Sequence, residues 1–411
     1  MFSPIAIVGR ACVLPGAHSP EALWDAVLAG RSLLSSVPEG RWRGRAEDLL
    51  CGPDGDATDR SWSDQGGYVT GFEELWDPEG FALPVSKLAG LDSLALHVLH
   101  TAREALRDAG DRRDGSAARP RTSAVFGNLG YPSASMTRFA EAVWEGSERP
   151  DARNRFMSGG TADLLRKALG LGPDVYCLDT ACASSLYAIK LACDQLHDGV
   201  ADVALAGAVS GADDLFIHVG FCALEAMSRS GQSRPFHADA DGLVPAEGAG
   251  FVVLKRLADA QRDGDTIHGV LRGVGLSNDG RARGFLAPSA EGQVRSIAAA
   301  YAGTDIEPTD VSLLECHATG TKVGDATEIQ SSAEVFAGHE GLPLGSLKSN
   351  LGHLITAAGV AGLIKVLEAM RHGVRPPNAA VSTLNPALAD SPFRLLQAPE
   401  PWEGRRIAGI S

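Results

Sequence analysis

The sequence predicts an α/β protein, in which short strands alternate with amphipathic helices. Short apolar segments recur from the first residues of the chain to the last, and many are followed by a stretch with apolar residues at helical spacing. Such alternation is typical of a sheet covered by helices. The composition agrees, because 48 glycines and only 6% aromatic residues suit closely packed helices and backbone.

The predicted strands are short apolar runs, as expected of buried strands. In order along the chain they are Ile5–Val8, Ser123–Phe126, Val175–Asp179, Val203–Val209, Gly250–Leu254, Val270–Gly273, Val311–Cys316, Leu344–Leu347 and Ile407–Ile410. The first helix has clear signals at both ends. Ser19 can cap it, Pro20 suits its first turn, Glu21–Leu28 continues it, and Gly30 ends it.

At 411 residues the chain is long enough for two domain-sized units or one large two-lobed body. The stretch 41–67 is rich in Arg, Asp and Gly and has no clear period, so we expect a long surface loop there. No low-complexity linker interrupts the chain.

A weak internal repeat suggests two similar lobes. When residues 183–200 are laid without gaps on residues 357–374, small residues lead each segment, an acid follows at Asp194 and Glu368, and Gly-Val closes both. Chance likeness between two helices is an equal alternative. If the repeat is real, each half supplies one buried central helix and the lobes pack face to face.

The formal net charge of −14 argues against nucleic acid as a partner, because phosphate binding needs a basic surface. Arg41, Arg43 and Arg45 form one local basic patch, and Arg112 with Arg113 forms another. Each patch could meet an acidic partner protein, and a solvated loop is the alternative. No apolar run approaches the length that spans a bilayer, so we expect no membrane span.

The cysteine pattern favours a reducing compartment. The seven cysteines form no Cys-x-x-Cys pair and show no repeated metal-ligand spacing. Together with the lack of a signal peptide, this predicts a cytoplasmic protein. Neither a metal nor a dinucleotide cofactor is indicated, and no Walker-type signature is present.

Cys182 is the strongest candidate nucleophile. In the run 175–186 a short apolar strand turns through small residues directly into a helical pattern. The thiol is therefore expected at or near a helix N-terminus. Unpaired N–H groups and the helix dipole there favour thiolate over thiol, so we expect a lowered pKa. A buried structural cysteine is the alternative.

Two histidine motifs in the second half complete a candidate site. His317 lies in Glu315-Cys-His-Ala-Thr-Gly-Thr321, and His353 ends Lys348-Ser-Asn-Leu-Gly-His353. Each motif follows a predicted strand and occupies a turn rich in Gly, Thr or Asn. Loop ends on a rigid scaffold often carry catalytic groups. The remaining histidines are expected to be structural or on the surface.

Three ordered blocks resemble the active-site motifs of β-ketoacyl synthases. The blocks are Asp179-Thr-Ala-Cys-Ala-Ser-Ser185, the His317 motif followed by Val323-Gly-Asp325, and the His353 motif followed by Ala357-Ala-Gly359. The chain is most similar to the ketosynthase domains of type I polyketide synthases. Supporting matches extend this resemblance over nearly the whole chain.

The resemblance implies a thiolase-like fold, a five-layered αβαβα body of two pseudo-symmetric halves, usually found as a homodimer. Residues 1–258 would form the N-terminal half, which carries the nucleophilic cysteine. Residues 259–411 would form the C-terminal half, which carries both histidines.

The resemblance also implies roles for individual residues. Cys182, His317 and His353 would be catalytic, and Lys348 would orient His353 and bias the local charge. The pantetheine-binding residues would be Thr319, Thr321 and Asn350. Asp325 and Glu328 resemble an acid pair, but their spacing favours capping of the following helix and internal pairing.

The implied activity is that of an acyltransferase that performs a decarboxylative Claisen condensation in polyketide or fatty-acid-like biosynthesis. Cys182 would take an acyl chain from the phosphopantetheine arm of an acyl carrier protein. A malonyl-type extender would then lose carbon dioxide, and the two histidines would stabilise its enolate. Because the arm arrives on the carrier protein, no bound cofactor is expected.

The chain also departs from the family pattern. It stops at Ser411, where the family continues into a loop that supplies a second oxyanion donor, so a truncated ketosynthase is expected. Ser93–Leu96 replaces the usual Pro-Gln-Gln-Arg, Ile355 stands where a glutamate is common, and His237 replaces an aspartate. These changes favour an iterative or lipid-type synthase over a standard modular one.

Two other functions stay open. A thiolase would need a second catalytic cysteine in place of His353, which the chain lacks. A non-catalytic ketosynthase-like partner or scaffold would typically lack the nucleophile, and Cys182 is present.

Overall fold

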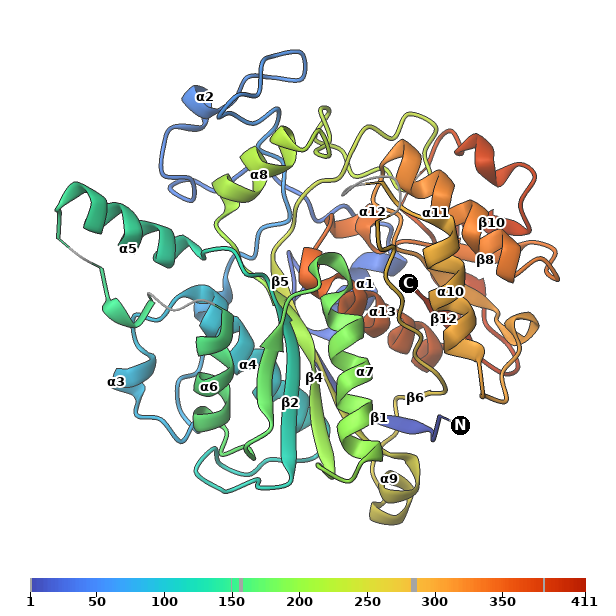
Figure 1. Cartoon of the computed structure of the whole chain (residues 1–411), viewed down its shortest axis with the longest axis horizontal. Helices are drawn as coiled ribbons and strands as arrows, with labels where there is room; N and C mark the ends of the chain where they lie inside the picture. Colours follow the sequence, from blue (N-terminus) through green and yellow to red (C-terminus); the bar gives the residue numbers. More distant parts are fainter. Residues whose placement is uncertain (1, 149, 155–157, 282–286, 380) are drawn as a thin grey trace.

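Two main sheets and the helices around them form five layers (Figure 1). The computed structural model describes residues 2–148, 150–154, 158–281, 287–379 and 381–411. In this part of the chain, no helix combines the length and the apolar character needed to cross a membrane.

The first sheet has six strands in the order β3-β2-β4-β5-β1-β6. β2, β3 and β4 run parallel, whereas β5 is antiparallel to both β4 and β1. The strands are β1 (Ile5–Val13), β2 (Thr122–Asn128), β3 (Val175–Leu178), β4 (Val203–Ser210), β5 (Gly248–Arg256) and β6 (Gly269–Leu271).

The second sheet has four parallel strands in the order β10-β8-β7-β12, and a two-stranded ribbon pairs β9 with β11. These strands are β7 (Leu313–Glu315), β8 (Leu342–Gly345), β9 (Val374–Arg375), β10 (Phe393–Leu395), β11 (Glu400–Pro401) and β12 (Ala408–Ile410).

The long helices form three layers. α4 (Ser93–Asp108) and α6 (Ser158–Ala168) pack with alternate residues of β1, such as Ala6 and Val8, on the outer face of the first sheet. The intervening residues Ile5 and Ile7 pack with the central helices on the opposite face. The central helices are α7 (Ser184–His197) and α13 (Ala358–His372), and the outer helices over the second sheet are α10 (Ala290–Tyr301) and α11 (Lys322–Val335).

The other helices are short or lie at the edges of these layers. The α-helices are α1 (Pro20–Leu28), α2 (Ala46–Leu49), α3 (Val85–Leu88), α5 (Ala134–Glu145), α8 (Asp214–Ala223), α9 (Leu257–Asp263) and α12 (Lys348–Leu351). The 3-10 helices are η1 (Phe72–Glu74), η2 (Ala152–Asn154), η3 (Ala181–Ala183), η4 (Pro308–Asp310), η5 (Ile355–Ala357) and η6 (Pro386–Leu388).

The first helix forms as its end signals predict. Pro20 begins α1, and the Ser19 side chain accepts a hydrogen bond from the backbone N–H of Ala22. The expectation of a surface loop over residues 41–67 is partly wrong, because this stretch contains α2 and buries Trp62 against Cys222 and Met227. Sequence periodicity cannot predict the burial of one aromatic residue in a polar segment, because a single apolar residue forms no repeating pattern.

The internal repeat is present in the backbone. η3 leads into α7 as η5 leads into α13, and both turns contain a non-glycine residue with a positive φ, 51° at Ala181 and 47° at Ile355. Both helices are followed by a left-handed glycine, with φ of 69° at Gly199 and 65° at Gly373. Two turns with the same rare conformation at the same spacing favour duplication over chance.

This repeat assigns a counterpart to the candidate nucleophile. The same alignment that pairs Ala181 with Ile355 pairs Cys182 with Thr356. Thr356 is fully buried and its hydroxyl donates a hydrogen bond of 2.6 Å to the carbonyl of Val209.

The boundary between the two halves is less clear than the repeat that relates them. The predicted boundary between residues 258 and 259 falls inside α9, and β6, which follows it, pairs with β1 in the first sheet. The placement of the boundary stays a prediction.

Candidate active site

Cys182 lies at the carboxyl end of β3, in η3, directly before α7. This confirms its predicted place near a helix start. The Asp179 carboxylate holds the turn by accepting hydrogen bonds of 2.8 Å from the backbone N–H groups of Ala181 and Gly130. Ala181 has a positive φ, a conformation that costs about 1–3 kcal/mol when a side chain is present. The turn is therefore maintained by its surroundings.

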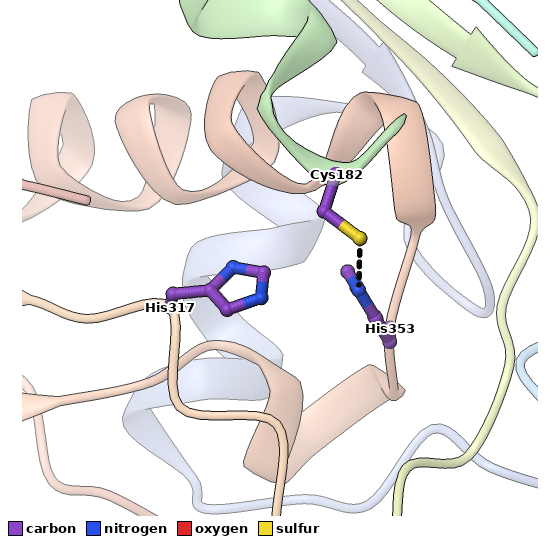
Figure 2. A group of neighbouring side chains, drawn as sticks. All are labelled: Cys182, His317 and His353. Carbon is purple, nitrogen blue, oxygen red and sulfur yellow. Dashed lines mark hydrogen bonds between the residues drawn. The ribbon is translucent and has the colours of Figure 1, made fainter. Parts of the chain in front are cut away.

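Three side chains from distant parts of the sequence meet here (Figure 2). Nε2 of His353 lies 3.0 Å from Sγ of Cys182. The rings of His317 and His353 stand edge to face, with centroids 5.2 Å apart and planes at 82°. Cys182 comes from the first half of the chain, whereas both histidines come from the second. The structure thus brings the three predicted catalytic side chains together.

The protonation of His353 follows from its second nitrogen. The backbone N–H of Ile355 donates to Nδ1 of His353 over 3.3 Å, so Nδ1 is the acceptor and Nε2 carries the proton. Burial, with smaller contributions from His317 and Lys348, lowers the pKa of His353 well below its usual value. The ring is therefore neutral, and Nε2–H is a hydrogen-bond donor that points at the sulfur.

The pKa of Cys182 differs from the prediction. Burial raises the pKa of its thiol to about 11, and Asp179 raises it further, while Lys348 and the residue's own backbone N–H oppose the increase. The predicted lowering is wrong, because that argument counted the helix start and not the apolar side chains around the sulfur. The buried side chains of the cluster against which Cys182 packs are Leu129, Ile217 and Ile355.

Lys348 is the cation of the site. It begins α12, only 5% of it is exposed, and its charge lowers the pKa values of Cys182 and His317. Burial lowers the pKa of Lys348 itself, and Glu315 and Glu328 oppose that effect. Burial and Lys348 together lower the pKa of His317 to about 3, so this ring is also neutral. The N–H of Ile355 supplies the contact that orients His353.

The His317 loop is held by a carboxylate. Glu328 accepts hydrogen bonds from the backbone N–H groups of His317, at 2.7 Å, and Ala318, at 2.6 Å. Asp325 likewise accepts from Phe236 and Gly320, at 2.8 and 3.1 Å. The expectation that these two acids cap α11 is wrong, because both lie inside α11 and bind backbone groups of neighbouring loops.

A buried ion pair connects the two histidine motifs. The sequence analysis did not predict it. Nζ of Lys365 lies 2.6 Å from a carboxylate oxygen of Glu315, and both residues are buried. The other oxygen of Glu315 accepts the backbone N–H of Leu347 at 2.6 Å. The sequence feature that could have predicted this pair is Glu315 at the end of an apolar strand, together with Lys365 on the buried helix α13.

The predicted pantetheine residues lie in two settings. Thr319 and Thr321 follow His317 in one turn, with their hydroxyl oxygens 3.2 Å apart. Asn350 is fully buried, and its amide nitrogen donates to the carbonyl of Arg31 at 2.9 Å. The structure therefore corrects the expectation that Asn350 binds pantetheine. Its amide is fully buried and connects α12 to Arg31, so it has no exposed surface for a pantetheine arm.

The three catalytic candidates also have the composition of a metal site, since their donor atoms lie within 4.8 Å of one another. The tautomer of His353 argues against that use. A metal needs a lone pair on Nε2, whereas the N–H of Ile355 favours a proton there. The residues fit a hydrogen-bonded site better than a coordination site.

The first basic patch is engaged within the chain. Arg41 pairs with Asp214 and Glu247, and Arg43 pairs with Glu141 at 3.0 Å. These pairs tie the 41–67 segment to α8 and α5, which accounts for the arginines without a partner protein.

Comparisons with known proteins find matches to one family over nearly the whole chain. Residues 2–260 match the family model described as "Beta-ketoacyl synthase, N-terminal domain", and residues 268–382 match "Beta-ketoacyl synthase, C-terminal domain". A "PKS-NRPS hybrid synthetase ATPKS" from Aspergillus niger is 36% identical over 99% of this chain, which spans 22% of that protein's length.

Two solved structures share the fold. The "PfaC Keto synthase-Chain length factor" matches with a TM-score of 0.94 and 34% identity, covering 99% of this chain and 46% of that one. The "Ketosynthase from module 6 of the bacillaene synthase from Bacillus subtilis 168" matches with a TM-score of 0.84 and 29% identity, covering 99% and 69%. These matches confirm the predicted thiolase-like α/β fold.

Proposed function

Because the chain belongs to the β-ketoacyl synthase family, we propose that it is a ketosynthase that extends acyl chains by decarboxylative Claisen condensation in polyketide or fatty-acid-like biosynthesis. The resemblance inferred from its three motifs is confirmed by the family models. One observation carries the proposed chemistry: the Nε2–H of a neutral His353 points at Sγ of Cys182 across 3.0 Å, beside His317.

The first half-reaction is acyl transfer. The sulfur of Cys182 attacks the carbonyl carbon of an acyl thioester, the new C–S bond forms, and the thiol of the carrier arm leaves with the proton that Cys182 has lost. The Nε2–H of His353 and the charge of Lys348 stabilise the sulfur anion during this step. No metal or bound cofactor is required in this proposal, because the arm brings the thioester.

The second half-reaction is condensation. A malonyl-type thioester loses carbon dioxide, and the resulting enolate attacks the acyl carbon on Cys182 and expels the sulfur. Two neutral imidazoles that donate hydrogen bonds stabilise the enolate oxygen. One such donor is worth about 2.7–4 kcal/mol in a transition state, so the pair accounts for a large part of the rate.

The proposed partners are an acyl carrier protein and a second copy of the chain. β3 is the edge strand of the first sheet and pairs with β2 on one side. Its residue Tyr176 is 38% exposed. An unpaired strand edge is a template for a second strand, so β3 pairing between two copies would continue the sheet through a homodimer.

Mass spectrometry of the intact protein tests the proposal directly. The chain is incubated with a panel of acyl carrier thioesters, and we expect a stoichiometric acyl adduct on the wild type and none on Cys182→Ala. Full condensation activity in Cys182→Ala would contradict the mechanism.

The histidines are tested on the second half-reaction. His317→Ala and His353→Ala should each reduce decarboxylation of a malonyl thioester by about 100-fold or more. Alkylation of Cys182 by iodoacetamide should stay largely intact in His317→Ala, which distinguishes a lost donor from a collapsed site. It should slow in His353→Ala, because this variant also loses the hydrogen bond to the sulfur. A chain that accepts no acyl group while folding normally would instead be the non-catalytic scaffold.

A further inference from the structure

A cavity of about 200 Å³ lies among arginine side chains on the first half of the molecule. Five arginines line it, namely Arg103, Arg107, Arg112, Arg113 and Arg119. We call this cavity the arginine pocket. It includes Arg112 and Arg113, the second basic patch of the sequence, for which the proposed function has no use.

The arginine pocket is remote from the nucleophile. Cys182 follows the carboxyl end of β3, whereas residues 111–119 precede the amino end of β2. Because β2 and β3 run parallel, these two positions lie at opposite ends of the sheet. The pocket is therefore separate from the site where the acyl chain reacts.

The pocket has an excess of positive charge in a chain whose net charge is −14. Asp111 pairs with Arg113 at 2.7 Å and with Arg119 at 2.9 Å. Glu104, next to the pocket, is shared by Arg103 and Arg107 at 3.1 and 2.8 Å. The lining thus holds five guanidinium groups and two carboxylates, Asp111 and Asp114, and two further carboxylates, Glu104 and Asp77, act on Arg103 from beside it. Each of the two bridging carboxylates already serves two cations.

Several donors remain for a ligand. Arg103 is 4% exposed, and it uses Nε on Glu104 and Nη1 on the carbonyls of Asp77 and Glu79. Within the described residues, Nη2 of Arg103 and Nη2 of Arg107 donate no hydrogen bond, and Arg112 has no ion pair. Burial and the neighbouring Arg107 lower the pKa of Arg103, as expected where cations crowd without enough counter-charge.

We propose that the arginine pocket binds a phosphate group, either as inorganic phosphate or as a phosphate monoester. The unused donors come from three separate guanidinium groups around one small cavity. A tetrahedral dianion accepts hydrogen bonds from several directions and supplies two negative charges, which matches both the geometry and the charge excess. A carboxylate supplies one charge in a plane, and the pocket already holds two of that kind.

Isothermal titration calorimetry at neutral pH and constant ionic strength tests this proposal on the whole chain. The probes are inorganic phosphate, adenosine monophosphate as a monoester, and a glutamate-rich peptide. We expect saturable binding of at least one phosphate probe to the wild type. Binding of inorganic phosphate assigns the site to the free ion, whereas binding of the monoester alone assigns it to a larger ligand.

The variant Arg107→Gln/Arg112→Gln removes two charges from the rim and keeps the buried Arg103 and Arg119 that support the fold. It should weaken phosphate binding by about tenfold or more, because it removes two charged hydrogen-bond donors from the site. The matched control is Arg166→Gln, an exposed arginine of α6 that pairs with Asp163 outside the pocket. This control should bind phosphate as the wild type does.

Three results would overturn the proposal. The wild type could bind neither phosphate probe, the double variant could bind phosphate as tightly as the wild type, or the peptide could bind more tightly than phosphate and lose its binding in the double variant. The last result would make the pocket a protein-docking surface. Alkylation of Cys182 should be unchanged by saturating phosphate, which keeps this test independent of the proposed ketosynthase activity.

Discussion

Cys182 and His353 meet across the two halves of the chain, with Sγ 3.0 Å from a nitrogen that carries a proton. His353 is held on both sides of its peptide, because its N–H donates to Val244 and its carbonyl accepts from Ala246. The ring therefore cannot turn to offer a lone pair without losing the bond from Ile355. In the proposed mechanism, His353 is therefore a donor to charge that develops at or near the sulfur.

The first prediction concerns the pH dependence of Cys182. Since its pKa is raised to about 11, the folded chain favours the thiol at neutral pH and forms thiolate only as the pH rises. The rate of alkylation by iodoacetamide should rise about tenfold per pH unit from neutral pH upward. Mass spectrometry of the modified peptide measures this rate, with Cys182→Ser as the blank. A plateau reached near neutral pH would contradict the raised pKa.

Lys348 should tune that reactivity. Lys348→Met removes the positive charge that lowers the pKa of Cys182, so the pKa should rise further and alkylation at a fixed alkaline pH should slow by about tenfold or less. Lys348→Arg should restore part of the rate. The exposed Lys167→Met is a control for the loss of one lysine. Equal rates in Lys348→Met and the wild type would remove Lys348 from the electrostatics of the site.

Glu328 is predicted to be a positioning residue for His317. Glu328→Gln replaces one accepting oxygen with an NH₂ group that faces a backbone N–H, so the His317 loop should shift. Decarboxylation of a malonyl thioester should fall by about 10- to 100-fold while alkylation of Cys182 is kept. Glu334→Gln, on the exposed side of the same helix, should have no effect. Equal losses in both activities would indicate general unfolding instead.

The buried pair of Glu315 and Lys365 should contribute to stability. Lys365→Met leaves an unpaired buried carboxylate and should cost about 3–5 kcal/mol of the free energy of unfolding in urea. Lys365→Met/Glu315→Gln should recover part of this loss, because the remaining amide is neutral. Lys167→Met breaks an exposed pair and should cost less than about 1 kcal/mol. A double variant as unstable as the single one would contradict the electrostatic account.

The sequence was sufficient for the main elements of the fold. The long strands β1, β2, β4 and β5 are almost entirely buried because helices cover both sides, so their sequences are mostly apolar runs that are visible without a structure. The two-residue strands β9 and β11 were missed, since so short a segment has no periodicity. The site residues could be proposed because each stands in a motif at the end of a strand.

The electrostatics of the site could not be predicted in the same way. The position of Cys182 at a helix start is a local property, and the sequence contains it. The apolar neighbours that raise its pKa include Leu129, Ile217 and Ile355, which are far from one another in the chain. Glu328 is similar, because it serves the His317 loop from two turns inside α11. Such effects depend on tertiary contacts that no local pattern encodes.

The duplicated turn allows Cys182 to be compared with a residue at the equivalent position of the same chain. Thr356 occupies the same turn as Cys182, directly after a residue with a positive φ, and it also carries a hydroxyl. That hydroxyl is buried and donates a hydrogen bond to the carbonyl of Val209. The turn by itself therefore does not leave its side chain open to a reactant. In the proposed mechanism, Cys182 differs from Thr356 by its position beside the two imidazoles, so transplanting the turn alone into another scaffold would reproduce only its shape.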